Sequence, residues 1–77
     1  MKDTLIFLVS GLVDHPESVH VDEVDEEGKT ILKLEVDPED MGKIIGKNGR
    51  IIRALRDLTK IIAAKQNRYV DVVLSEE

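Results

Sequence analysis

The sequence predicts an α+β fold in which three helices cover one face of a three-stranded sheet. Three observations support this prediction: stretches with helical spacing of apolar residues, stretches in which apolar and polar residues alternate, and glycine or proline at the breaks between them. The 77 residues suffice for only one domain. We therefore expect one two-layer domain over residues 1–77, in the order helix, strand, strand, helix, helix, strand.

The first element is expected to be a helix. Asp3 and Thr4 are suited to cap it, and Asp14-His15-Pro16 should end it, because the residue before a proline avoids the helical region. Between these limits the apolar residues recur at helical spacing: Leu5, Leu8, Val9 and Leu12.

Two strands should follow as a β-hairpin. Alternation around Val19, Val21 and Val24 indicates a half-buried strand, and residues 31–36 form the second. The second strand has three apolar residues on one face: Leu32, Leu34 and Val36. A polar turn over residues 25–29, which contains a glycine, joins the two strands.

A short helix, a long helix and a third strand complete the prediction. Asp37 can cap the short helix, Pro38 suits its first position, and Gly46 should end it near Ile45. The long helix spans residues 50–64, and its predicted core face consists of Ile51, Leu55, Leu58 and Ile62. After a turn at residues 67–68, the third strand alternates Val70, Val72 and Leu74, and residues 75–77 form a polar tail.

The charge is distributed unevenly. The net charge is −5, but residues 1–42 contain three Lys and twelve acidic residues, whereas residues 43–68 contain eight Lys or Arg and one acid. This asymmetry indicates a basic surface on an acidic body. The lack of cysteine excludes disulfides and thiolate metal sites and favours a reducing cytoplasm. The apolar stretch 5–13 is too short to span a bilayer, so we expect no membrane partner.

The segment between the two C-terminal helices contains the most informative motif, Gly46-Lys47-Asn48-Gly49. Its glycines permit positive φ angles and the close approach of a phosphate backbone, and Lys47 and Arg50 add positive charge at a helix N-terminus. The spacing fits neither the dinucleotide fingerprint nor the P-loop. A plain turn between two helices is the alternative interpretation.

The segment 40–51, with an isoleucine pair before the glycine loop and Ile52 after it, resembles the signature of KH domains. The N-terminal helix and strand resemble the type II arrangement, with residues 1–29 as the extension and about 30–75 as the core. The length and the loop sequence resemble the bacterial stand-alone KH family KhpA. The resemblance implies that the chain holds about four nucleotides of single-stranded RNA against the loop.

The resemblance also implies an apolar groove for the bases. The implied RNA-contacting residues are Lys43, Ile44, Ile45, Gly46, Lys47, Asn48, Gly49, Arg50, Ile52 and Arg53, with Leu34 or Val36 as weaker candidates. Ordinary core packing is the alternative for each of these apolar residues, and above all for Ile44 and Ile52. Arg53, Arg56 and Lys60 form a basic stripe on the long helix, for which a solvated helix face is the alternative.

Self-association through the long helix is a further expectation. Ile61 lies at the edge of the predicted core face, close to Ala54 and Ala64. The alternative is that the sheet covers Ile61. The resemblance implies a homodimer, or a heterodimer with a larger RNA-binding protein of the KhpB type (also called Jag or EloR). It further implies an RNA chaperone or post-transcriptional regulator linked to cell length and peptidoglycan homeostasis.

Catalytic and metal chemistry are not expected. His15 and His20 are isolated in the sequence, and the acidic residues 22–27 do not match a calcium loop. We therefore predict no enzyme activity, no metal and no cofactor. Two other functions stay open: a helix-turn-helix that reads duplex DNA, and a protein-interaction module whose loop no longer binds nucleic acid.

Overall fold

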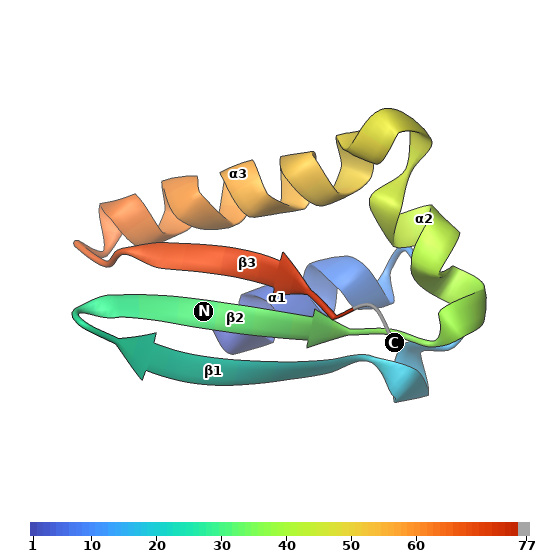
Figure 1. The fold of residues 1–77 in the computed structure, drawn as a ribbon, viewed down its shortest axis with the longest axis horizontal. Coiled ribbons are helices and arrows are strands. Elements are labelled where there is room, and N and C mark those ends of the chain that lie inside the picture. Colours follow the sequence, from blue (N-terminus) through green and yellow to red (C-terminus); the bar gives the residue numbers. More distant parts are fainter. Residues whose placement is uncertain (76–77) are drawn as a thin grey trace.

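The computed structural model describes residues 1–75 and confirms the predicted order of elements (Figure 1). The helices are α1 (Lys2–Ser10), α2 (Met41–Ile45) and α3 (Arg50–Lys65), and the strands are β1 (His20–Glu26), β2 (Lys29–Glu35) and β3 (Val70–Leu74). Short 3-10 turns lie at η1 (Pro16–Ser18), η2 (Pro38–Asp40) and η3 (Lys47–Gly49). Two residues of the predicted polar tail, Glu76 and Glu77, lie outside the described residues.

The three strands form one sheet in the order β1-β2-β3. β1 and β2 are antiparallel, whereas β3 joins the other side of β2 in parallel. The hairpin turn is shorter than predicted, because Glu27 and Gly28 both adopt positive φ angles, +49° and +81°. A two-residue turn of this kind matches the right-handed twist of the strands, so the pairing of β1 with β2 continues up to the turn.

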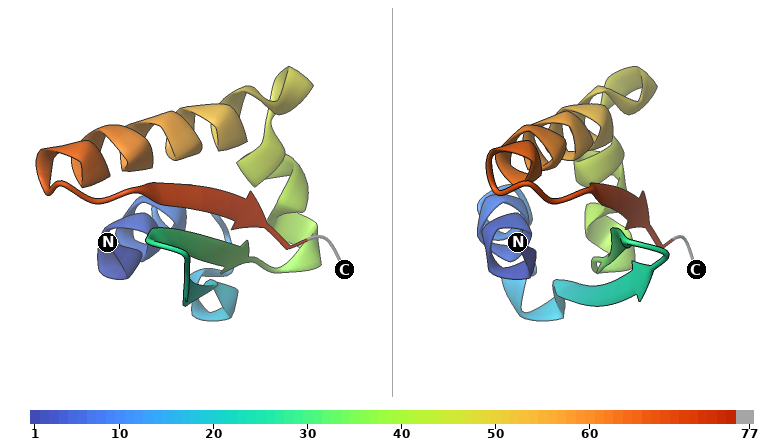
Figure 2. Two further views of the ribbon diagram at one scale, coloured as in Figure 1. Left: turned by 60° about the vertical axis from the view of Figure 1, so that its left-hand side comes forward. Right: turned by 90° about the vertical axis from the view of Figure 1, so that its left-hand side faces the viewer.

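The helices cover one face of this sheet, as predicted. Two views agree that α1 and α3 lie on the same side, while the opposite face is open (Figure 2). The core between the layers is almost entirely aliphatic, and its most deeply buried side chains include Leu5, Val9, Leu32, Leu34, Ile44, Val70 and Val72. No helix in the described part of the chain is long and apolar enough to cross a membrane.

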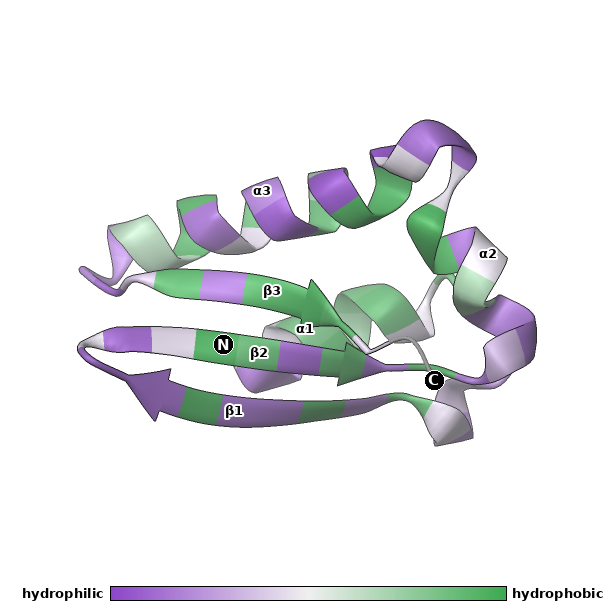
Figure 3. Cartoon of the chain, viewed as in Figure 1, coloured by the Kyte–Doolittle hydropathy of each residue, from purple (hydrophilic) through white to green (hydrophobic). Residues whose placement is uncertain are grey.

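The two edges of the sheet differ in character. Figure 3 shows that β1 is largely hydrophilic and β3 largely hydrophobic. Acidic side chains along an edge strand discourage pairing with other chains, which accounts for the composition of β1. Val70 and Val72 of β3 are buried in the core, whereas Val73 is 44% exposed and can contact a ligand.

Helix α1 differs from the prediction at both ends. It begins at Lys2, with no side-chain cap hydrogen bond, so Asp3 and Thr4 lie inside its first turn. It ends at Ser10, and the Leu12 amide bonds to the Val9 carbonyl at 2.9 Å in a tighter final turn. Leu12 is consequently outside the helix and 45% exposed.

The predicted core face of α3 is partly wrong. Leu55 is buried, but Ile51 and Leu58 are 36% and 42% exposed. The small residues Thr59 and Ala63 contribute to the buried face instead. The Thr59 hydroxyl donates to the Leu55 carbonyl at 2.7 Å, so this buried hydroxyl has a hydrogen-bond partner inside the core. Because apolar residues occur on more than one side of α3, periodicity could not identify the buried side.

A buried carboxylate joins distant parts of the chain. Asp40, at the start of α2, is 1% exposed and accepts hydrogen bonds from the backbone amides of Asp14 at 3.1 Å and His15 at 3.0 Å. These bonds hold the connection between α1 and β1 against the start of α2. These bonds join residues 25 and 26 positions apart, so no local sequence pattern indicates them.

Replacing Asp40 with Asn should destabilise the fold. The amide group offers only one oxygen, so either the Asp14 or the His15 amide loses its buried acceptor. We expect the free energy of unfolding to fall by about 1–3 kcal/mol, measured by urea denaturation. The exposed control Asp22→Asn should change it by less than about 0.5 kcal/mol. Equal effects of the two substitutions would contradict this role.

Candidate nucleic-acid interface

The loop between α2 and α3 depends on Gly46. Its φ of +72° and ψ of 177° lie in a region that is essentially restricted to glycine. A Cβ atom at this position would also lie only 2.6 Å from Cγ1 of Ile51. Asn48 and Gly49 adopt positive φ angles as well, 57° and 72°. The loop is therefore a tight, fixed turn packed against the first turn of α3.

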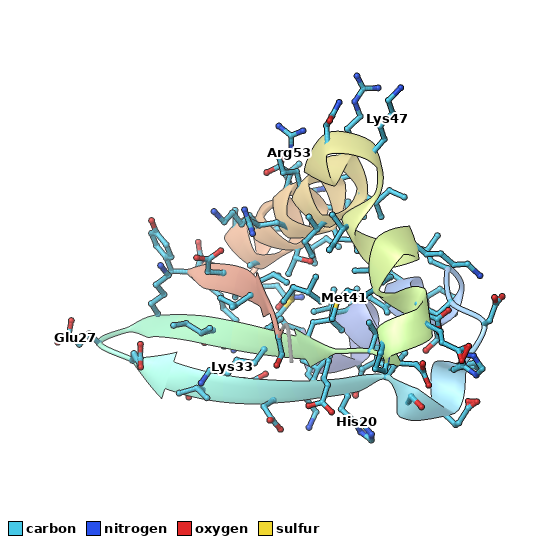
Figure 4. All side chains as sticks on the ribbon, turned by 45° about the vertical axis from the view of Figure 1, so that its right-hand side comes forward. His20, Glu27, Lys33, Met41, Lys47 and Arg53 are labelled. Atoms are coloured by element: carbon cyan, nitrogen blue, oxygen red, sulfur yellow. The ribbon has the colours of Figure 1, made fainter. Side chains whose placement is uncertain are left out.

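Positive charge is concentrated around this loop. Lys47, Asn48 and Arg50 are exposed. Arg53 folds back and donates to the Asn48 carbonyl at 2.7 Å and to the Gly49 carbonyl at 3.2 Å. Figure 4 shows Lys47 and Arg53 at one end of the molecule, far from His20 on the sheet. Within residues 1–75, none of Lys47, Arg50 and Arg53 has an acidic partner within 4.0 Å.

An open groove of about 520 Å³ begins beside the loop and runs between α3 and β3. Its lining residues are Ile45, Ile52, Arg56, Lys60, Asp71, Val72, Val73 and Leu74. The groove thus combines apolar side chains, which can contact the faces of bases, with cations that can contact phosphates or base edges.

Asp71 lines the groove and lies close to three cations. Its carboxylate lies 3.6 Å from Lys29, 3.8 Å from Lys60 and 3.9 Å from Arg56. Partial burial alone would raise the pKa of Asp71, but the Val72 amide hydrogen bond and these three cations together lower that pKa. The Arg56 Nε also donates to the Val72 carbonyl at 3.3 Å, across the groove.

The structure brings only some of the predicted contact residues to the groove. Ile45 and Ile52 line it, but Ile44 is completely buried in the core and cannot reach a ligand there. Leu34 and Val36 are also buried, since the strand beside the groove is β3 and not β2. The sequence predicted β3 as a strand but not as a wall of the groove, because its position depends on parallel pairing with β2, which no local pattern reveals.

Lys43 contacts acidic residues at the other end of α2. Its ammonium group bonds to the Asp14 carboxylate and lies 3.9 Å from the Asp40 carboxylate. The hydrogen bond between Lys43 and Asp14 lowers the pKa of Asp14 and raises the pKa of Lys43. Lys43 therefore has a structural ion pair and does not line the groove.

His15 is not as isolated as the sequence indicated. Its two ring nitrogens lie 3.9 Å from the Glu17 carboxylate and 3.6 Å from the Glu39 carboxylate, and Asp37 is also near. Desolvation opposes protonation of His15, but the surrounding carboxylates outweigh it and raise its pKa. Exposed carboxylates often gather in this way without a metal ion, and the cluster lies apart from the groove.

A second exposed apolar feature lies on α3. We call it the α3 stripe, and it consists of Ile51, Ala54, Leu58 and Ile61. These residues are spaced three and four apart and so share one face of the helix. Ile61 is 58% exposed, so the alternative that the sheet covers it is wrong. Ala64 is also exposed but lies to one side of the stripe.

The helix–loop–helix with its glycine loop, set on this three-stranded sheet, defines a type II KH domain. A family model described as KhpA/KhpB, KH domain matches residues 2–74. The chain belongs to this family. It is 51% identical over 72 residues to "RNA-binding protein KhpA" of Clostridium perfringens, covering 94% of this chain and 96% of the relative. It is 43% identical over 77 residues to the protein of that name in Chlamydia caviae, covering 100% and 99%.

A solved structure supports the same fold. The chain aligns with the crystal structure of Era from Aquifex aeolicus with a TM-score of 0.58 and 18% sequence identity. The alignment covers 95% of this chain but only 28% of Era. At this identity the likeness concerns the fold alone.

Alanine at Gly46 should disrupt the loop, whereas alanine at Gly42 should not. The methyl group of alanine at position 46 would meet Ile51, and alanine would have to adopt a disfavoured backbone conformation. Together these effects should cost at least about 1–3 kcal/mol of unfolding free energy. Gly42 lies within α2 with nothing within 4 Å of a Cβ, so alanine there should be neutral or stabilise by up to about 1 kcal/mol. Thermal unfolding of both variants tests this, and equal stability of the two would refute it.

Proposed function

We propose that this protein binds single-stranded RNA, holding the sugar-phosphate backbone at the loop Gly46–Gly49 and the bases in the adjacent groove. The observation that carries the proposal is the position of a cationic glycine loop at the mouth of an apolar and basic groove. Within residues 1–75, Lys47 and Arg50 of this region have no acidic partner within 4.0 Å. The name of the relatives, RNA-binding protein KhpA, supports RNA as the ligand.

Each part of the site has a distinct role in this proposal. Gly46 and Gly49 let a phosphate approach the backbone, while Lys47 and Arg50 supply charge. Asn48 offers hydrogen bonds to the sugar-phosphate chain. Arg53 acts as a positioning residue, because its guanidinium holds two loop carbonyls.

The bases would lie against apolar side chains. Ile45 and Ile52 provide the surface next to the loop, and Val73 and Leu74 provide the opposite wall. None of the described residues that line the groove is aromatic, so stacking contributes little there. One domain should consequently hold about four nucleotides weakly and with little sequence choice.

Weak, unselective binding suits an RNA chaperone or post-transcriptional regulator acting in the cytoplasm, and we propose that role without a catalytic activity. A link to cell length and peptidoglycan homeostasis is part of the proposal only through the family resemblance. Useful affinity then requires that two sites engage one RNA.

Reversing the charge of the loop should abolish most RNA binding. Lys47→Asp with Asn48→Asp places two carboxylates where a phosphate should lie, while both positions are exposed, so the fold should persist. We expect at least a tenfold weaker affinity for unpaired RNA, measured by fluorescence polarisation.

The affinity of the wild-type protein for unpaired RNA should fall as salt rises. A plot of log affinity against log salt concentration should have a slope of about −2 to −3, from three or four phosphate contacts, and the slope for the loop variant should be shallower.

A matched control separates local charge from total charge. His20→Asp with Lys33→Asp makes the same change in net charge on the open face of the sheet, where both residues are exposed. This control should keep near wild-type affinity. If the loop variant binds as well as the control, or if duplex DNA binds more tightly than unpaired RNA, the proposal is wrong.

We also propose that the α3 stripe pairs two chains, either two copies or this chain and a KhpB-type partner. Ile51, Ala54, Leu58 and Ile61 follow the alternating three- and four-residue spacing of a helix–helix seam. Ala54 lets two helices approach closely, and the flanking isoleucine and leucine side chains would lose their exposure to water. Pairing also supplies the second RNA site that weak binding requires.

Ile61→Asp should give a folded monomer. A carboxylate buried in the seam without a partner should raise the dissociation constant at least about 100-fold, while the exposed position leaves the fold intact. Light scattering measures the mass and circular dichroism the fold. Phe7→Asp, at a 78% exposed apolar residue of α1, should leave the mass unchanged. A wild-type chain that remains monomeric at high concentration, even in cell extract, would exclude this pairing.

A further inference from the structure

Tyr69 is an exposed aromatic residue on a rigid backbone. It is the only tyrosine of the chain, and the residue is 69% exposed. Its carbonyl accepts the Thr30 amide at 2.8 Å, and the next residue, Val70, is buried in the core. The preceding Arg68 amide donates to the Ala63 carbonyl at 2.9 Å. The ring is thus presented to solvent by a fixed segment between α3 and β3.

A second pocket, of about 190 Å³, lies between this ring and the C-terminal end of α3. It is lined by Lys60, Ala64, Arg68, Tyr69 and Val70. Lys60 also lines the main groove, so the pocket continues that groove away from the glycine loop. At 1.5 Å per residue along α3, Ala64 lies about 22 Å from Gly49, which makes the pocket a separate subsite.

One cation lies near the ring, and two more border the pocket. The Lys29 ammonium lies 5.7 Å from the ring centroid, and Lys60 and Arg68 border the pocket. Asp71 lies within 4.0 Å of both Lys29 and Lys60 and so holds these two cations near the ring. A rigid aromatic ring flanked by cations is the combination that proteins use to bind an unpaired base together with its phosphate.

We propose that Tyr69 stacks on a nucleobase of the same RNA strand that occupies the groove, with Lys29, Lys60 and Arg68 contacting the neighbouring phosphates. This inference rests on the proposed RNA binding. It extends the bound length beyond the four or so nucleotides at the loop and groove. The small side chain of Ala64 leaves room for a flat ring beside Tyr69.

Tyrosine fluorescence tests the proposal directly, because the chain has one tyrosine and no tryptophan. The wild-type protein is titrated with a four-nucleotide RNA and with the same RNA lengthened by three nucleotides on its 5′ or its 3′ side. One lengthened RNA should quench the emission and bind more tightly, whereas the short RNA should bind without quenching. Tyr69→Ala should weaken binding of that longer RNA about 5- to 150-fold and leave the short RNA unaffected.

Two control variants complete the test. Tyr69→Phe keeps the ring and should bind the longer RNA like the wild type, and Phe7→Ala removes an exposed aromatic side chain of α1 without effect. If both lengths bind equally and the emission does not change, the Tyr69 subsite is wrong although RNA binding stands. If Tyr69→Ala weakens both lengths alike, the subsite is also wrong. If no RNA binds, the proposed function fails together with this inference.

Discussion

The close contact between Gly46 and Ile51 determines the geometry of the whole site. Because no side chain separates the loop from the first turn of α3, α2 can turn sharply into α3 and place the loop at the mouth of the groove. Ile51 has a second face toward solvent, where it begins the α3 stripe. Ile51 therefore belongs both to the surroundings of the proposed RNA-binding loop and to the proposed pairing surface. A partner bound on α3 would contact the residue that packs against Gly46.

Two groups of basic residues differ in their surroundings. Lys47, Arg50 and Arg53 have no acidic partner within the described residues and leave positive charge at the loop uncompensated. Arg56, Lys60 and Lys29 instead lie within 4.0 Å of the Asp71 carboxylate, which neutralises part of their positive charge. Of these three, Arg56 and Lys60 line the groove. The acidic β1 lies at the opposite edge of the sheet (Figure 3). A polyanion is thus directed to one side of an acidic protein, since charges beyond about 8 Å are screened at physiological salt.

The order of elements, the hairpin and the glycine loop could be predicted from the sequence, because each depends on local spacing or on residues with special backbone freedom. It was insufficient where packing between distant segments decides. The buried side of α3 could not be read from periodicity, since Ile51 and Leu58 look like core residues while Thr59 and Ala63 contribute to the core. The groove wall formed by β3 and the hydrogen bonds from the Asp14 and His15 amides to Asp40 depend on contacts between residues far apart in the chain.

The central claim is that unpaired RNA lies between the glycine loop and the edge of β3. Mapping the backbone amide resonances of the protein by NMR during titration with a short single-stranded RNA tests this claim most directly. The account predicts the largest shifts at residues 46–50 and 72–74, with little change at His20 and Lys33 on the open face of the sheet. Shifts confined to that open face or to α1, with none at the loop, would contradict it.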